Sequence, residues 1–167
     1  MTPAQLLRDA FERVRDTALT TVDGLSEEQL AHRPTPDANP IGWLVWHLTR
    51  VQDDHVAGVA DLEQVWVSRG HLDRFGLGLD PRDIGYGHSR EEVAGVRAPA
   101  DRLADYLREV TEQTLAFVDG LCERDLDRVV DPDWEPPVTL GVRLLSVIND
   151  DLQHAGQAAY VRGLLAG

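Results

Sequence analysis

The sequence contains no lysine. All sixteen of its cationic residues are arginines. The chain has twenty-nine acidic residues, so the net charge is −13. A chain of this charge is repelled by phosphate backbones, so we expect no nucleic-acid partner. Cysteine is almost absent as well. The single Cys122 excludes an internal disulfide framework and fits a reducing compartment, so we expect a cytoplasmic protein. Its acidic neighbours would not activate a thiol, and we do not expect Cys122 to be a nucleophile.

Long apolar runs are also missing. No stretch reaches the ~18 consecutive apolar residues of a membrane span. The first residues carry acids and lack an apolar core, so we expect neither a membrane segment nor a signal peptide. The apolar fraction of 43% is ordinary for a globular protein. With 167 residues, the chain can bury a core of its own, and we expect one domain over residues 1–167.

Helix signals are present instead. Thr2, Pro3 and Gln5 form the capping pattern of a helix start, and apolar residues then recur every three or four positions until Asp-Gly at 23–24. A second helix is predicted from Asn39 as N-cap and Pro40 as its first residue, with an apolar stripe to Leu62.

A Gly-rich section, residues 67–89, separates this pattern from the next one. Sections this long inside a compact domain usually cover or complete a site. A third helix is predicted from the capping box Ser89–Glu92, with a bend near Pro99, and a fourth from about Thr139 to Leu165. No stretch shows the sustained alternation of a sheet, so the predicted class is all-α with negligible strand.

The chain repeats itself weakly. "VDGLSEEQL" at 22–30 returns as "VDGLCERDL" at 118–126, each time at the end of a long helix and before a Pro-rich link. This predicts a four-helix bundle of two pseudo-repeated αα-hairpins, with a long crossover, residues 67–89, between helices two and three.

Polar residues interrupt the apolar face of the fourth helix. Asp150 and His154 lie one turn apart on a side that also carries Val147 and Val161. A buried carboxylate without a partner is very costly, and a divalent metal would neutralise it. A surface hydrogen bond between the two side chains is the plainer alternative. Asp151 competes as the carboxylate, because the helical wheel places it nearer the centre of the apolar stripe.

A third ligand has to come from another helix, and His47 is the best candidate. It lies at the edge of the apolar stripe of the second helix, which the repeat places in the bundle interior opposite the fourth. Three protein ligands with open positions are typical of a catalytic metal site. His55 follows eight residues later, about 12 Å along a helix, so we do not expect it to share the ion.

Three segments resemble the DinB-like superfamily of four-helix-bundle metalloproteins, in particular an actinobacterial branch of unknown function. "HAGQAAYVRG" at 154–163 is similar to the end of that family's fourth helix. "IGWLVWHLTRVQ" at 41–52 is similar to the segment that carries its first metal histidine. "DRFGLGLDPRDIGYGHSREEVAGVRA" at 73–98 is similar to the crossover of this branch.

The resemblance implies a zinc, nickel or iron ion held by His47, Asp150 and His154. Aspartate departs here from the glutamate or histidine of many relatives and has a shorter reach. Characterised relatives include maleylpyruvate isomerase and thiol S-transferases that use mycothiol or bacillithiol, with the metal activating the thiol. We therefore expect a metal-dependent S-transferase or isomerase acting on a small-molecule thiol and an electrophile.

Three further expectations complete this hypothesis. Tyr86 or His88 of the crossover would reach over the metal and bind substrate. The family resemblance also leads us to expect a homodimer. The competing hypothesis is a non-catalytic bundle that binds metal or dimerises, because a fold alone does not establish chemistry.

Overall fold

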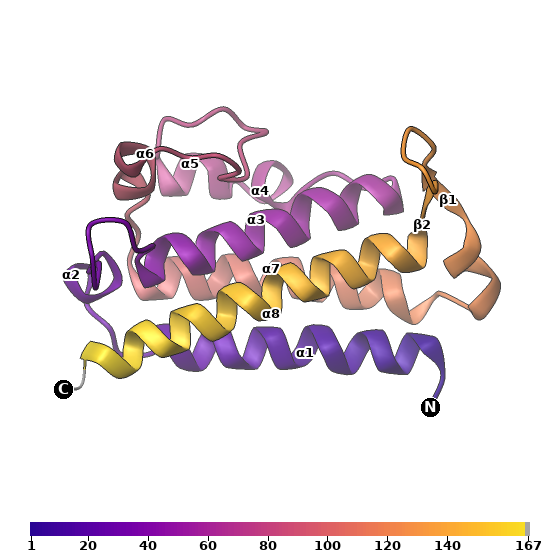
Figure 1. The fold of residues 1–167 in the computed structure, drawn as a ribbon, viewed down its shortest axis with the longest axis horizontal. Coiled ribbons are helices and arrows are strands. Elements are labelled where there is room, and N and C mark those ends of the chain that lie inside the picture. Colours follow the sequence, from indigo (N-terminus) through magenta and orange to yellow (C-terminus); the bar gives the residue numbers. More distant parts are fainter. Residues whose placement is uncertain (166–167) are drawn as a thin grey trace.

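Four long helices form a bundle in the computed structural model, which describes residues 1–165 (Figure 1). They are α1 (Pro3–Val22), α3 (Ile41–Ala60), α7 (Ala100–Asp119) and α8 (Leu140–Leu165). The predicted all-α bundle with a crossover between its second and third long helices is confirmed. Among residues 1–165, no helix is both long enough and apolar enough to cross a membrane.

Short elements connect the long helices. They are α2 (Glu27–Leu30), α4 (Val65–Ser68), α5 (His71–Phe75), α6 (Arg90–Gly95), the 3₁₀ turn η1 (Glu123–Asp127), and the strands β1 (Val129–Asp131) and β2 (Val138–Thr139). The two strands form an antiparallel ribbon beside the start of α8, the only sheet within the described residues (Figure 1).

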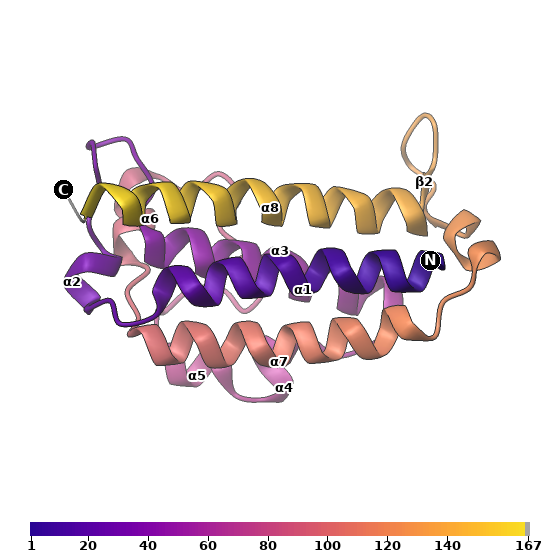
Figure 2. The ribbon, with the colours of Figure 1, turned by 90° about the horizontal axis from the view of Figure 1, so that it is seen from below.

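The two halves of the chain interlock. α3 packs on α8 and α7, and α1 packs on the same two helices, whereas α1 and α3 touch little. Figure 2 shows α1 in front, between α8 and α7, with α3 behind it. Helices that follow each other within one half therefore lie on opposite corners of the bundle. The most extensive interface, between α3 and α8, joins the first half to the second.

The nine-residue repeat is a structural repeat. Both copies run from the end of a long helix into a short helical turn that begins with a capping box. The next long helix then starts with a glycine against that turn. A Cβ added at Gly42 would lie 3.2 Å from the carbonyl oxygen of Leu30, and one added at Gly141 would lie 3.3 Å from that of Leu126.

Two predicted helix starts differ from the structure, both at prolines. The N-cap of α3 is Pro40 rather than Asn39, because the first helical hydrogen bond runs from the Leu44 N–H to the Pro40 carbonyl. The predicted bent third helix is two helices, α6 and α7, with Pro99 as the N-cap of α7. Proline lacks an N–H and disfavours helical geometry in the residue before it, so the chain breaks instead of bending.

The crossover covers the outer side of α3. It is less irregular than predicted, because α4 and α5 lie within it, and α4 already begins at Val65. Figure 1 shows α4, α5 and α6 above α3, away from α1. As a result, every residue of α3 from Ile41 to Asp53 is buried, including polar residues that a two-sided helix would expose. The predicted metal ligand His47 is therefore covered by the crossover.

Candidate metal centre

The three predicted ligands meet between α3 and α8. One ligand atom each from His47, Asp150 and His154 lies within 4.8 Å of the other two. His47 is buried with 6% of its surface exposed, and its ring meets that of His154 edge to face, with the centroids 4.7 Å apart. It is Asp150 that joins this cluster, whereas Asp151 is fully buried on the core side of α8.

Hydrogen bonds fix the tautomers of both histidines. Nδ1 of His47 donates to the carbonyl oxygen of Ile84 in the crossover, and Nδ1 of His154 lies 2.9 Å from the carbonyl oxygen of Asp150. A carbonyl only accepts, so each Nδ1 carries the proton and each Nε2 keeps its lone pair. Metal-bound histidines are oriented by this kind of hydrogen bond on the second nitrogen.

The charge states of the cluster differ between its members. Burial lowers the pKa of His47 and favours the neutral, ligand form. Burial would also lower the pKa of His154, but the Asp150 carboxylate, with Oδ2 3.2 Å from Nδ1, outweighs this through its close contact and its charge and raises it. Burial would raise the pKa of Asp150, yet the same close contact and the charge of His154 prevail and lower it below 3.8.

One oxygen of the carboxylate lacks a hydrogen bond. Oδ2 of Asp150 is buried and accepts none from the residues that the structure describes, although Nδ1 of His154 lies 3.2 Å away. The proton of that nitrogen is already directed to the Asp150 carbonyl. A buried anionic oxygen beside two imidazole lone pairs is a donor set for a cation. The residues present therefore fit a divalent ion of the zinc, nickel or iron kind.

The crossover touches the cluster through a glycine. Gly85 has a φ of +89°, and a Cβ there would lie 2.9 Å from Nδ1 of His47 and 2.9 Å from the ring of Trp46. Only glycine permits this approach, and the approach brings the Ile84 carbonyl to His47. The ring of Trp43 stacks on that of His47, with centroids 4.5 Å apart.

A buried arginine anchors the crossover to α3. Arg50, one turn after His47, is fully buried. Its Nε donates to the carbonyl oxygen of Asp83 at 3.0 Å, and its Nη2 donates to that of Pro81 at 3.1 Å. These bonds hold the segment that ends in Ile84. Arg50 therefore acts on the cluster through the position of a main-chain carbonyl.

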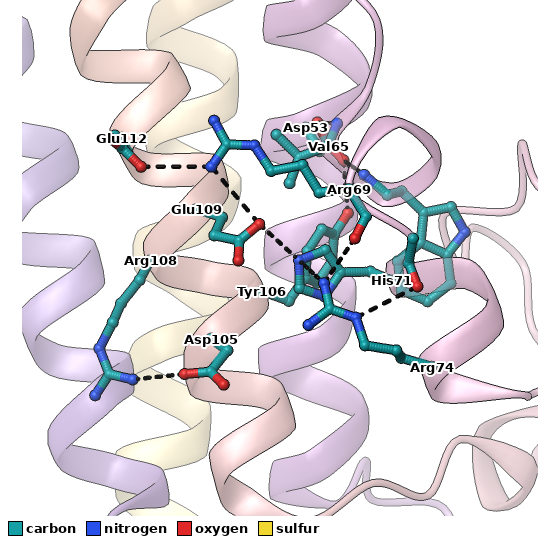
Figure 3. A network of polar contacts seen from close by, with 12 residues as sticks. Asp53, Val65, Arg69, His71, Arg74, Asp105, Tyr106, Arg108, Glu109 and Glu112 are labelled. Atoms are coloured by element: carbon teal, nitrogen blue, oxygen red, sulfur yellow. Dashed lines mark hydrogen bonds and ion pairs between the residues drawn. The ribbon is translucent and has the colours of Figure 1, made fainter.

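Asp53 connects the same arginine to the start of the crossover. Its carboxylate accepts hydrogen bonds from the N–H groups of Val65 and Trp66 and from the hydroxyl of Tyr106, each at 2.8 Å. Figure 3 shows Asp53, Val65 and Tyr106 in this network. Burial raises the pKa of Asp53 despite these bonds, and Arg50 lies 3.5 Å away as its counter-charge. Sequence analysis missed the Arg50–Asp53 pair.

A second histidine continues the network outward. His71 of α5 is fully buried, and its Nε2 lies 3.1 Å from the carboxylate of Glu109 on α7 and 3.1 Å from Arg74 (Figure 3). Burial lowers the pKa of His71. This contact ties the crossover to α7 and lies outside the His47–Asp150–His154 cluster.

The two predicted substrate residues differ in their freedom. Both ring nitrogens of His88 are engaged: Nδ1 accepts from Nε1 of Trp43 at 3.1 Å, and Nε2 lies 3.0 Å from the carboxylate of Asp83. Tyr86 is 92% exposed and lines the same cavity as His47 and Asp150.

This cavity runs along the groove between α3 and α8. Its volume is about 240 Å³, and besides His47 and Asp150 it is lined by residues that include Val51, His55 and Arg143. His55 and Arg143 also line a wider groove of about 570 Å³ that continues toward β1. Within the described residues, His55 is not part of the ligand cluster.

A helical bundle that gathers two histidines and a carboxylate from facing helices belongs to a class in which metal sites are built in the bundle core. A family model described as mycothiol-S-transferase matches residues 6–167. The chain therefore belongs to the mycothiol S-transferase family of DinB-like proteins. Comparison with curated proteins gave no match.

A solved structure supports the fold. The crystal structure of a conserved protein from Enterococcus faecalis matches with a TM-score of 0.92 and 32% identity, covering 100% of this chain and 99% of that one. The likeness extends over the long helices and the crossover alike, because it covers the whole of both chains.

Proposed function

We propose that the protein is a metal-dependent S-transferase that joins a low-molecular-weight thiol of the mycothiol type to a small electrophile. Family membership supports the thiol and the transfer. The observation that carries the metal dependence is the buried Oδ2 of Asp150, which has no hydrogen bond from the described residues and faces two histidines whose Nδ1 protons are already directed elsewhere.

The proposed roles follow from this arrangement. His47, Asp150 and His154 would hold the ion, beside the cavity that His47 and Asp150 line. A divalent ion bound there supplies a positive charge that stabilises a thiolate. The sulfur then forms a bond to the electrophilic carbon, the leaving group departs with its electron pair, and the thiol proton passes to solvent. The roof of Trp43 and Gly85 excludes water from one side of the site.

We assign different tasks to the two crossover residues. Tyr86, which is exposed at the cavity, is proposed to contact the substrate. His88 keeps the crossover in place through Trp43 and Asp83, since both its ring nitrogens are engaged.

The test uses the purified chain after reconstitution with zinc, nickel or iron. Elemental analysis is expected to give one ion per chain, and mass spectrometry is expected to detect the conjugate of mycothiol with a chlorinated electrophile above the uncatalysed rate. A bound ion without any conjugate would favour the non-catalytic metal-binding bundle. A chain that binds no ion would remove both the S-transferase and the metal-binding bundle, and it would leave a non-catalytic bundle that dimerises.

We further propose a homodimer in the cytoplasm. α8 exposes an apolar stripe on its outer side, formed by Val142, Leu145, Leu152 and Tyr160, and burial of such a stripe by a second copy would remove it from water. Sedimentation at micromolar concentration is expected to give twice the monomer mass. Leu145→Glu is expected to shift the mass to that of a monomer, and a monomeric wild type would contradict the proposal.

A further inference from the structure

The cavity beside the candidate metal centre has a second polar end. His55 lies two turns after His47 on α3, and Arg143 lies two turns before Asp150 on the antiparallel α8. All four residues line the same cavity of about 240 Å³. Figure 1 shows that β1 and β2 flank this end, where α3 finishes and α8 begins.

The two residues of this end present donors. Nη1 of Arg143 donates to Nδ1 of His55 at 3.2 Å, so the proton of the neutral imidazole is on Nε2. Nη2 of Arg143 donates to Oδ2 of Asp131 at 3.0 Å. A guanidinium has five N–H groups, so these two bonds hold it in place and leave others for a ligand. The pair therefore matches an acceptor, and a planar carboxylate suits the fork of an arginine best.

The side chain of Arg143 is only 22% exposed, so solvent screens its charge less than that of a surface arginine. Asp131 already pairs with this guanidinium, and Asp54 lies 3.8 Å from His55. A ligand carboxylate would therefore use the N–H groups of Arg143 that Asp131 leaves unpaired, and it would share the cation with Asp131.

The size of the cavity limits the ligand. A volume of about 240 Å³ is below the ~300–1,000 Å³ of sites for drug-sized ligands, so it suits a small acid. A complete thiol of the mycothiol type needs more room and would extend into the adjoining groove of about 570 Å³. The cavity itself is thus left to the electrophile.

We propose that Arg143, held by Asp131 and supported by His55, binds the carboxylate of the electrophilic substrate beside the metal centre. This assignment rests on the proposed S-transferase function and names the substrate class: a small, carboxylate-bearing electrophile. Arg143 is then a specificity residue of the site.

The experiment measures binding by calorimetry on the zinc-loaded full-length chain, with cinnamate as the probe and cinnamamide as its neutral isostere. Cinnamate is expected to bind more tightly than the amide. Arg143→Gln is expected to weaken cinnamate by about tenfold or more, because a charge-assisted bond is lost, and to leave the amide unchanged. Arg143→Lys keeps the charge, so its affinity for cinnamate is expected to lie between those of the wild type and Arg143→Gln. Arg128→Gln is the control, since Arg128 lines only the wider groove.

Two further arms separate the possible causes. His154→Ala removes a metal ligand, and its binding of cinnamate is expected to persist, so a failed S-transferase function leaves this subsite testable. Loss of cinnamate binding in that variant would mean that the carboxylate binds the ion, and it would overturn the proposal. N-acetylcysteine and its amide test the thiol as the source of the anion. A preference for the carboxylate thiol that disappears in Arg143→Gln would move the subsite to the thiol and overturn the assignment to the electrophile.

Discussion

The groove between α3 and α8 has two ends that are built differently. At the crossover end, His47 is buried, Gly85 lies against its ring, and Arg50 bonds to two crossover carbonyls. At the open end, beside β1 and β2, His55 is one-third exposed and Arg143 lines a cavity that adjoins a wider groove. Packing and hydrogen bonds hold His47 in place at the first end, whereas the second end leaves a cavity open between the side chains.

This difference matches the two demands that the proposed transferase activity would place on the site. A metal site needs ligands held within fractions of an ångström, which packing and outer hydrogen bonds provide. A substrate site has to admit and release molecules, so rigid packing on every side would hinder it. The same pair of helices meets both demands because the crossover covers only one end of the groove.

The largest expected effect is the loss of metal binding in His154→Ala. One of three ligands disappears, so the loss should exceed the ~10–100-fold that follows removal of an outer hydrogen-bond partner. His55→Ala at the open end is the matched control and should keep one ion per chain. Elemental analysis after dialysis measures both. Equal metal content in the two variants would contradict the assignment of the ligands.

The next effect concerns the anchor of the crossover end. Arg50→Met should lower the free energy of unfolding by about 3–5 kcal/mol, because it leaves the buried Asp53 carboxylate without its counter-charge. Arg108→Met removes a surface ion pair with Asp105 at 3.1 Å and should cost at most ~1 kcal/mol. Urea unfolding monitored by circular dichroism compares them. Similar losses of unfolding free energy in the two variants would show that the buried Arg50–Asp53 pair contributes no more than a surface ion pair.

Two adjacent carboxylates should give opposite pH dependence in the metal-free protein. Burial and the charge of Asp150 raise the pKa of Asp151 well above 3.8, and its carboxylate has no hydrogen bond from the described residues. The folded state therefore keeps a proton that the unfolded state loses. Its contribution to stability is fully present below 3.8 and falls as pH rises, by at most ~1.4 kcal/mol per pH unit.

Asp151→Asn should flatten this decline between about pH 4 and pH 7. Asp150→Asn should remove a loss of stability at low pH. The pKa of Asp150 is lowered in the folded state, so its contribution to stability is present above 3.8 and is lost as pH falls below that value. The free energy of unfolding in urea checks both variants when it is measured from about pH 2.5 to pH 7, because the contribution of Asp150 changes only below 3.8. Parallel profiles for the wild type and Asp151→Asn would mean that Asp151 is ionised in the folded state.

The smallest effect separates backbone strain from contact. Gly85→Ala and Gly87→Ala both place a side chain at positive φ, +89° and +76°, and the backbone strain alone should cost each variant about 1–2 kcal/mol. Only the Cβ at position 85 meets the His47 ring, whereas position 87 has nothing within 4 Å. Zinc affinity should therefore fall in Gly85→Ala alone. Equal zinc affinities of the two variants would mean that the contact of Gly85 with His47 does not position that histidine.

The parts of the site that follow helical periodicity could be predicted from the sequence. Spacing placed Asp150 and His154 on one face, and the apolar stripe of the second helix together with the internal repeat pointed to His47, which the family resemblance then supported. Periodicity also placed Asp151 near the centre of the apolar stripe, where it is fully buried. It could not decide which carboxylate faces the histidines, because that choice depends on the rotation of α8 against α3.

The parts that depend on the crossover could not be predicted in this way. A loop has no period, so the approach of Gly85 to His47 leaves no regular signal, although its glycine between Ile84 and Tyr86 is a hint of close contact. The burial of Arg50 requires a cover that the apolar stripe of α3 does not reveal. An arginine and an aspartate three residues apart in a strongly apolar helix were the available signal.

The matching glycine contacts at the starts of α3 and α8 have one more consequence. They define which positions of the two helices are equivalent under a pseudo-twofold axis. His154 follows Gly141 by thirteen residues, and His55 follows Gly42 by the same number. His55 is therefore the symmetry mate of His154, a proposed metal ligand.

The other ligands have mates too. By the same offset, His47 corresponds to Ser146 and Asp150 to Val51, and both mates line the cavity with His55. The chain thus carries the candidate ligand cluster on one side of a symmetric scaffold, and on the other side an incomplete copy that retains only the histidine. Val51→Asp combined with Ser146→His would restore that copy, and the groove would then hold two ions related by the axis of the fold.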